Sequence, residues 1–158
     1  MGVARVWLAG AQDVDAVAAL MTQFRDHMGR DEPGGDQLRA TAAELLSDPN
    51  GEFVLAAPDG EGEPAGVCQL RFRLTIWTGA NDCWLEDLFV SSSARRAGLG
   101  RALVTAALER AEARGCRRIE LDVDDDNHSA IALYEAMGLS LESKPPGRNY
   151  LMGRKLPR

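Results

Sequence analysis

A basic loop with two glycines, set between a strand and a helix, is the feature of this sequence with the clearest chemical meaning. Residues 84–90 carry the aromatic and branched apolar side chains typical of a strand, and residues 99–108 place Leu and Ala at helical spacing. The loop therefore precedes a helix, whose first N–H groups lack partners within the helix and whose dipole favours an anion. Its candidate phosphate ligands are Arg95, Arg96, Ala97, Gly98, Gly100 and Arg101.

The composition of this loop suits a diphosphate. Glycines lack the Cβ atom that would block close approach, and the three arginines add positive charge. The alternative is that Gly98 ends a turn and the arginines are solvated, because a lone Gly-x-Gly is a weak signal. Two other phosphate motifs are excluded: a P-loop needs Lys where this chain has Arg101, and a dinucleotide-binding loop needs a third glycine where it has Leu103.

Two segments of the chain resemble the GNAT N-acetyltransferase superfamily. Arg95, Gly98 and Gly100 occupy the three fixed places of its acetyl-coenzyme A signature, Arg/Gln-x-x-Gly-x-Gly/Ala after a strand. Residues 127–139 are similar to its Asn-x-x-Ala-x-x-Leu-Tyr-x-x-x-Gly-Phe block, with Leu139 in place of the usual Phe. By these two matches in the right order the chain is identified as a member, and the resemblance covers roughly residues 3–156.

The resemblance implies an α/β fold and a route for the cosubstrate. We expect a single domain over residues 1–158, with a mixed, mostly antiparallel sheet of six to seven strands and helices on both faces. In the superfamily the strand before the phosphate loop splays from the next strand, and its free backbone groups pair with the pantetheine arm. The corresponding residues here are Leu88, Phe89 and Val90. One of their N–H groups could polarise the thioester carbonyl, and Asn127 either binds the pantetheine or caps the helix that follows.

Two side chains are expected to take part in catalysis. The resemblance places Tyr134 where the family's tyrosine commonly protonates the coenzyme A sulfur, the alternative being a ring that only packs in the core. Strand alternation sends Glu86 and Asp87 to opposite faces, with Asp87 sharing its face with Leu85 and Phe89. The resemblance favours Glu86 as a base, acting directly or through water, or as an anchor for the substrate ammonium. The alternative is an exposed acid at the sheet margin.

Periodicity and turn residues predict the elements that must position these groups. A helical pair near the N-terminus is expected to flank the acceptor pocket, as in the superfamily. The expected helices are 13–29, about 38–46, 98–114 and 127–137, and the expected strands are 4–8, 52–57, 64–77, 82–90 and 117–124, with a closing hairpin of 139–143 and 148–155.

Composition and charge restrict the class of protein. A chain of 158 residues with 45% hydrophobic and 27% charged residues suits one soluble domain. A net charge of −6 disfavours nonspecific binding to nucleic acid, which requires a basic face. No uncharged apolar run approaches the roughly 20 residues needed to span a bilayer, so we expect a cytoplasmic protein with no membrane partner.

The cysteines do not indicate a metal site. Their number, three, is odd, they show no Cys-x-x-Cys spacing, and only two histidines could join them. We therefore expect Cys68, Cys83 and Cys116 to act as small buried hydrophobic residues, and we expect no metal cofactor.

These observations lead to an acetyl-CoA-dependent N-acetyltransferase that acts directly on a primary amine in a ternary complex. Residues 85–90 look like the corresponding strand of the diamine and polyamine acetyltransferase branch, which together with the acidic charge favours a small cationic acceptor. A peptide or protein amine is an alternative acceptor. A noncatalytic acyl-CoA-binding module and a nucleotide-binding protein are alternatives from other functional classes. Dimers are frequent in the superfamily that the chain resembles, so a homodimer is compatible with the resemblance.

Overall fold

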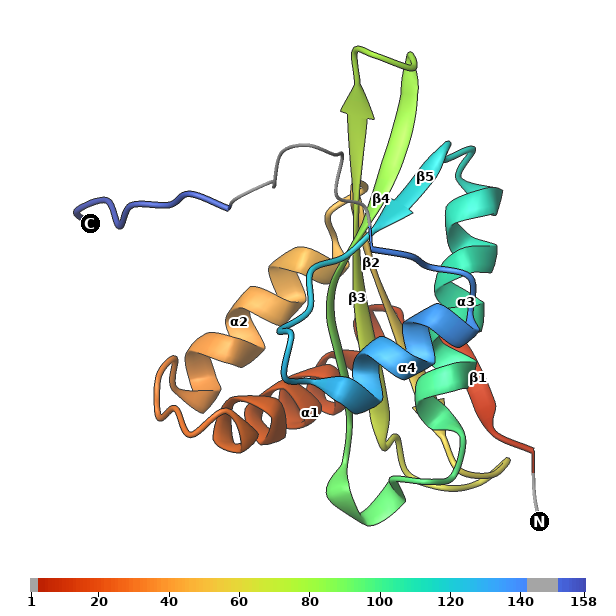
Figure 1. The fold of residues 1–158 in the computed structure, drawn as a ribbon. Helices are drawn as coiled ribbons and strands as arrows, with labels where there is room; N and C mark the ends of the chain where they lie inside the picture. The colour runs from red at the N-terminus through yellow and green to blue at the C-terminus, as the bar shows by residue number, and fades with distance from the viewer. Residues whose placement is uncertain (1–2, 142–150) are drawn as a thin grey trace.

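The computed structural model describes residues 3–141 and 151–158, which form one mixed sheet with helices on both faces (Figure 1). The strands run in the order β1-β2-β3-β4-β5. The first three pairings are antiparallel and the β4–β5 pairing is parallel. The strands are β1 (Arg5–Leu8), β2 (Gly51–Ala57), β3 (Gly66–Thr75), β4 (Ala80–Val90) and β5 (Arg118–Glu120), and the helices are α1 (Val14–His27), α2 (Gly35–Leu46), α3 (Leu99–Ala113) and α4 (His128–Ala136).

The predicted number of six to seven strands is not matched, because the described residues contain five. The predicted closing hairpin falls largely on residues 142–150, outside the described residues, and the described segment 151–158 contains no strand. The strand predicted over 117–124 is shorter, since its pairing with β4 stops at Glu120. The four predicted helices and the other predicted strands are present, with ends that differ by a few residues.

Two apolar clusters hold the layers together, one on each face of the sheet. Along β2, Val54 and Ala56 pack in the cluster that contains Leu103 of α3, whereas Phe53 and Leu55 pack in the cluster that contains residues of α1 and α2. This alternation is the period-two pattern of a strand buried on both sides. Figure 1 shows α1 and α2 on one face and α3 and α4 on the other.

A β-bulge interrupts the alternation in β4. Gln69 of β3 pairs with Asp87 whereas its neighbour Leu70 pairs with Leu85, so Glu86 is an extra residue in β4. Leu85 consequently packs in the cluster under α3 while Phe89 packs in the cluster under α1 and α2. Strict alternation had predicted that Leu85 and Phe89 share a face, and that prediction is wrong because one extra residue shifts the period.

The cysteines are packed as small hydrophobic residues. Cys68 and Cys83 are buried, Cys116 is half-buried, and all three are free thiols. Burial raises the pKa of Cys83 to about 12, with a further contribution from the nearby Cys116. Burial likewise raises the pKa of the Cys68 thiol. Neither thiol forms a thiolate near neutral pH, which agrees with a packing role for both.

Candidate functional site

The first turn of α3 presents backbone donors that have no acceptor. The first hydrogen bond of the helix runs from the Ala102 N–H to the Gly98 carbonyl at 3.0 Å. No side chain caps the helix, so within the described residues the N–H groups of Leu99, Gly100 and Arg101 are without acceptors. A helix of 15 residues adds the positive end of its dipole at the same place. The geometry is that of an anion site.

Backbone conformation shapes the loop before α3. Gly98 is the N-cap residue with φ of +77°, in the left-handed region that favours glycine, and a Cβ added there would meet nothing within 4 Å. Arg96 also has a positive φ, of +70°. Gly100 is also constrained by packing, because a Cβ there would lie 3.2 Å from Cδ2 of Leu133 in α4. This contact between helices was not predicted from the sequence, and the approach of a diphosphate to both glycines stays a prediction.

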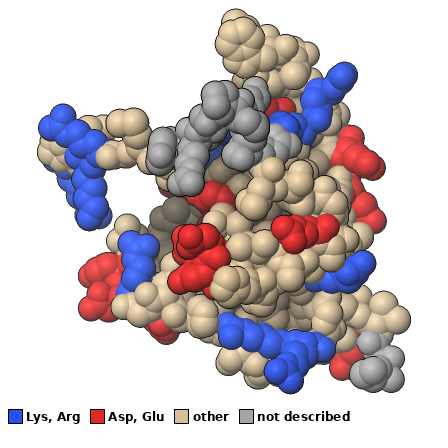
Figure 2. Space-filling model, viewed as in Figure 1, with Lys and Arg blue, Asp and Glu red and all other residues tan. Residues whose placement is uncertain are grey.

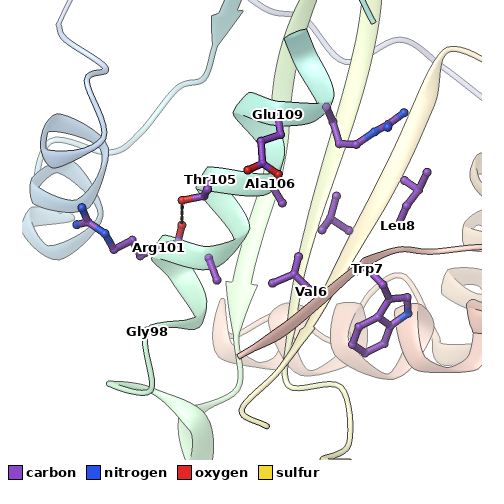
Figure 3. A pocket seen from close by; sticks show the side chains of 11 residues that line it. Val6, Trp7, Leu8, Gly98, Arg101, Thr105, Ala106 and Glu109 are labelled. Carbon is purple, nitrogen blue, oxygen red and sulfur yellow. Dashed lines mark hydrogen bonds between the residues drawn. The ribbon is translucent and has the colours of Figure 1, made fainter. Parts of the chain in front are cut away.

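The loop arginines are exposed. The Arg95 Nε donates to the Val90 carbonyl at 3.4 Å, which directs this side chain back along the end of β4. In Figure 3 the Arg101 side chain extends from α3 toward α4 and away from β1. Figure 2 shows basic side chains gathered at the lower edge of the molecule, where Figure 1 has the loop between β4 and α3. The charge therefore lies beside the free N–H groups.

The strand that leads into this loop has an open edge. β5 pairs with β4 only at Asp82↔Arg118, Cys83↔Ile119 and Trp84↔Glu120. Beyond these pairs, residues 85–90 of β4 have β3 on one side and no other described strand on the opposite side. The predicted residues Leu88, Phe89 and Val90 lie in this half, so their backbone is accessible to an extended ligand. The open edge runs directly into the loop that precedes α3.

Tyr134 lies close to the open edge. It is a half-buried residue of α4, and burial raises the pKa of its phenol, with a smaller contribution from the nearby Cys68. Cys68 pairs across the sheet with Leu88, which places Tyr134 on the α3 side of the open half of β4. A phenol with a raised pKa stays protonated at neutral pH, so it can act as a proton donor.

Asn127 is the N-cap of α4. Its Oδ1 accepts from the backbone N–H of Ala130 at 3.3 Å and from the Ser129 hydroxyl at 3.4 Å. Of the two interpretations left open by the sequence, capping is the one supported by contacts, because the side chain satisfies a donor in the first turn. A ligand contact by Asn127 stays a prediction.

Asp87 lies on the face of the sheet that the helical pair covers, together with Phe89 as predicted but apart from Leu85. Asp87 pairs with Gln69 and is half-buried on the same face as Phe89. Burial raises the pKa of Asp87, and the carboxylates of Glu86 and Asp122 raise it further. Glu86, at the bulge, is exposed. The sequence contained a signal for this arrangement, since two acids stand between Leu85 and Leu88, whose apolar spacing of three does not fit an unbroken strand.

Aromatic rings of α1 lie over the end of β4. The rings of Phe24 and Phe89 meet edge to face with centroids 5.2 Å apart, and the His27 ring is 6.1 Å from that of Phe89. This contact fixes the last turns of α1 above the open half of β4, on the face that also carries Asp87.

The concave regions of the described structure include two that border predicted site residues. One, of about 680 Å³, is bordered by β5 and α4, and its lining includes Trp84, Asp122 and Tyr134. The other, of about 500 Å³, runs between β1 and α3 (Figure 3). It includes only Gly98 and Arg101 of the predicted site residues, and the Arg101 side chain points away from β1. Of the predicted site residues the first region includes only Tyr134, so neither region by itself contains the expected site.

Across residues 3–141 and 151–158, no helix has the length and apolarity required to cross a bilayer. In the same ranges, no three His, Cys, Asp or Glu side chains are grouped as a metal ion would require. The absence of a metal cofactor stays a prediction.

Comparison with known proteins places the chain among acetyltransferases. The model of the acetyltransferase (GNAT) family matches residues 15–139, a range that contains every predicted site residue. Thialysine N-epsilon-acetyltransferase of Sus scrofa is 32% identical over 117 residues, covering 65% of this chain and 66% of that protein. Mycothiol acetyltransferase of Kineococcus radiotolerans is 35% identical over 136 residues, covering 86% of this chain and 42% of that protein. The chain thus spans less than two thirds of each of these relatives.

A solved structure gives the same picture of the fold. A protein from Arthrobacter sp. FB24, whose acetyltransferase assignment is provisional, is 30% identical and has a TM-score of 0.82. The alignment covers 99% of this chain and 97% of that one. The arrangement of sheet and helices described above is therefore shared along nearly the whole chain.

Proposed function

This chain belongs to the GNAT acetyltransferase family, and from that premise we propose that it is a single acetyl-CoA-dependent N-acetyltransferase domain over residues 1–158. It transfers the acetyl group directly to a primary amine in a ternary complex. The observation that carries the proposal is the continuity of two open hydrogen-bonding surfaces. The free edge of β4 leads into the uncapped first turn of α3.

The cosubstrate fits these two surfaces. Its diphosphate would accept from the free N–H groups at the start of α3, with countercharge from the loop arginines. Its pantetheine arm would pair with the backbone of Leu88, Phe89 and Val90, as an additional strand would. Bound there, acetyl-CoA supplies an acyl carbon activated as a thioester.

The residues around the open edge have separate roles in the transfer. An N–H group of the open strand polarises the thioester carbonyl as the amine nitrogen attacks its carbon. The carbon–sulfur bond breaks, and the Tyr134 hydroxyl donates its proton to the departing sulfur. Its raised pKa keeps that proton in place until the sulfur takes it. The new amide nitrogen releases its extra proton to water, and proton transfer from solvent restores the phenol.

The two carboxylates of the bulge, Glu86 and Asp87, bind and deprotonate the acceptor amine. Most primary amines arrive protonated, because their pKa is near about 10. Glu86 is exposed, so it can accept the ammonium proton through water. Asp87 is half-buried beside the aromatic contact with α1 and is suited to hold the charged amine before it loses that proton.

The acceptor is a small cationic amine. Glu86, Asp87 and Asp122 lie close enough to interact, and no cationic side chain is paired with any of them in the described residues. A positively charged ligand would relieve their mutual repulsion. The name of the Sus scrofa relative, a thialysine acetyltransferase, supports this class. We also propose a cytoplasmic protein that binds neither nucleic acid nor membrane and that can form a homodimer.

The test is release of free thiol from acetyl-CoA in the presence of an amine panel. The panel contains thialysine, spermidine, an aminoglycoside and a lysine peptide. We expect acceptor-dependent release that is fastest with the small polycations. Saturable binding of coenzyme A without release by any amine would favour a noncatalytic acyl-CoA-binding module, and preferential release with the peptide would favour a protein acceptor.

A further inference from the structure

A single hydrogen bond joins α1 to the residue at which the phosphate loop begins. Ser91 directly follows β4 and is only 7% exposed. Its hydroxyl donates to Oε1 of Gln23 at 2.7 Å, across a separation of 68 residues in the chain. In the described residues no other side-chain hydrogen bond links α1 to residues 91–98. The contact is therefore specific to this pair.

The backbone of Ser91 is equally constrained. Its N–H donates to the Ala65 carbonyl at 2.8 Å, and its own carbonyl accepts from the Ala94 N–H at 2.9 Å. The second bond closes the short 3₁₀ helix, Ser92–Ala94, with which the loop starts. Ser91 is buried, and its N–H, carbonyl and hydroxyl groups are all hydrogen-bonded. A change in the conformation of the loop therefore shifts the hydroxyl that holds Gln23.

Gln23 stands in the part of α1 that covers the open half of β4. Its neighbour Phe24 packs edge to face on Phe89, and His27 lies one turn further along over the same ring. The Ser91 hydroxyl thus connects the loop proposed for the diphosphate with the helix proposed to bound the acceptor.

We propose that Ser91 and Gln23 are positioning residues that couple the two substrate sites, so that a diphosphate bound at α3 orders the last turns of α1 over the acceptor site. The inference rests on the proposed function. An anion on the free N–H groups of Leu99 and Gly100 favours one conformation of the loop, and the Ser91–Gln23 bond favours the matching position of α1. By linkage, an amine held under α1 then strengthens cosubstrate binding by the same factor.

Amide hydrogen exchange of the full chain tests this coupling with coenzyme A as the probe, and no acceptor needs to be known. In the unmodified protein we expect coenzyme A to slow exchange in residues 91–101. It should also slow exchange in residues 23–28 by about threefold or more, a size consistent with the net contribution of one hydrogen bond. Slower exchange in residues 23–28 is the result that supports the coupling.

Three substitutions separate coupling from simple stability. Ser91→Ala and Gln23→Met each remove the hydrogen bond, and we expect residues 91–101 to respond to coenzyme A while residues 23–28 no longer do. Gln23→Glu keeps an oxygen that can accept from Ser91 and should preserve both responses. Thr22→Ala is the matched control, because the Thr22 hydroxyl donates to the Ala18 carbonyl within the same helix at 2.8 Å.

Two results would overturn the coupling and leave the proposed function standing. One is coenzyme A binding to the unmodified protein with no change in residues 23–28. The other is a full response of these residues in Gln23→Met, which lacks the oxygen that accepts from Ser91. A complete lack of coenzyme A binding would overturn the proposed function together with the coupling.

Discussion

Gly100 at the start of α3 and Leu133 of α4 are packed so closely that only a glycine fits at position 100 without displacement. An added Cβ would lie 3.2 Å from the Leu133 Cδ2 atom, tighter than ordinary contact. Leu133 directly precedes Tyr134, so the smallness of Gly100 determines how near the proposed acid lies to the helix that holds the diphosphate.

Gly100→Ala is therefore expected to reduce kcat more than it weakens coenzyme A binding. A shift of a few tenths of an ångström in α4 moves the Tyr134 hydroxyl away from the position in which it donates to the coenzyme A sulfur. Misplacement on this scale should lower kcat by roughly threefold to tenfold. The Kd for coenzyme A, measured by calorimetry, should change less. Leu133→Val removes the methyl group at issue, so the double variant Gly100→Ala/Leu133→Val should recover most of kcat. Weaker coenzyme A binding without recovery would mean that Gly100 serves the diphosphate alone.

Tyr134→Phe should lower kcat by about 10²-fold while leaving the Kd for acetyl-CoA within about twofold, because general acid catalysis typically contributes that much. The pKa of Tyr134 is raised, so the unmodified enzyme should lose activity only well above neutral pH through this group. Steady-state kinetics over a pH series measures both effects. Unchanged kcat in Tyr134→Phe would show that the phenol only packs against the sheet.

The two carboxylates of the bulge should respond differently to loss of charge. Asp87→Asn should raise the KM for a cationic amine by roughly tenfold, because it removes one charge contact from a partly desolvated site. Glu86→Gln should lower kcat/KM mainly at pH values where the amine arrives protonated, and so make the rise of kcat/KM with pH steeper. Identical KM and pH profiles for the two variants would contradict this division of roles.

The stability of the protein should also report on Asp87. Its pKa is raised in the folded state, by burial first and then by Glu86 and Asp122. A carboxyl of this kind favours folding most below its unfolded pKa, near about 3.9, and the benefit is lost as the pH rises through the folded pKa. Asp87→Asn should therefore raise the free energy of unfolding at pH 7 relative to the unmodified protein. Urea titrations at pH 4 and 7 measure the difference, which should shrink at the lower pH.

An ion pair between α3 and β2 gives a prediction that is independent of catalysis. Arg110 donates to the Glu52 carboxylate from Nε at 2.9 Å and from Nη2 at 2.7 Å. The Glu52 side chain is 10% exposed and that of Arg110 is 33% exposed. Arg110→Met should cost about 3 kcal/mol, since it leaves the more buried charge with a weaker partner. Glu52→Gln should cost less, because the guanidinium it leaves behind reaches water. Urea denaturation that ranks the two in the reverse order would contradict this argument.

Much of the architecture could be predicted from the sequence, because it depends on local patterns. Periodicity placed the helices and most strands, and the resemblance around Gly98 and Tyr134 led to the correct family. The separation of Leu85 from Asp87 and Phe89 was missed because the bulge depends on pairing with β3, which no single strand encodes. The contacts of Ser91 with Gln23 and of Gly100 with Leu133 join distant parts of the chain, and only the folded structure brings them together.

The bulge at Glu86 makes the length of this stretch more critical than its composition. Plain alternation of the same residues would turn every side chain after the bulge to the other face of the sheet. Deletion of Glu86 would leave Leu85 and Asp87 as consecutive partners of Leu70 and Gln69, so Phe89 would keep its aromatic partner. Insertion of one more residue into plain pairing would instead send Phe89 to the opposite face. Insertions in this segment should therefore be much less tolerated than in the exposed hairpin at Trp77, where the chain turns in solvent.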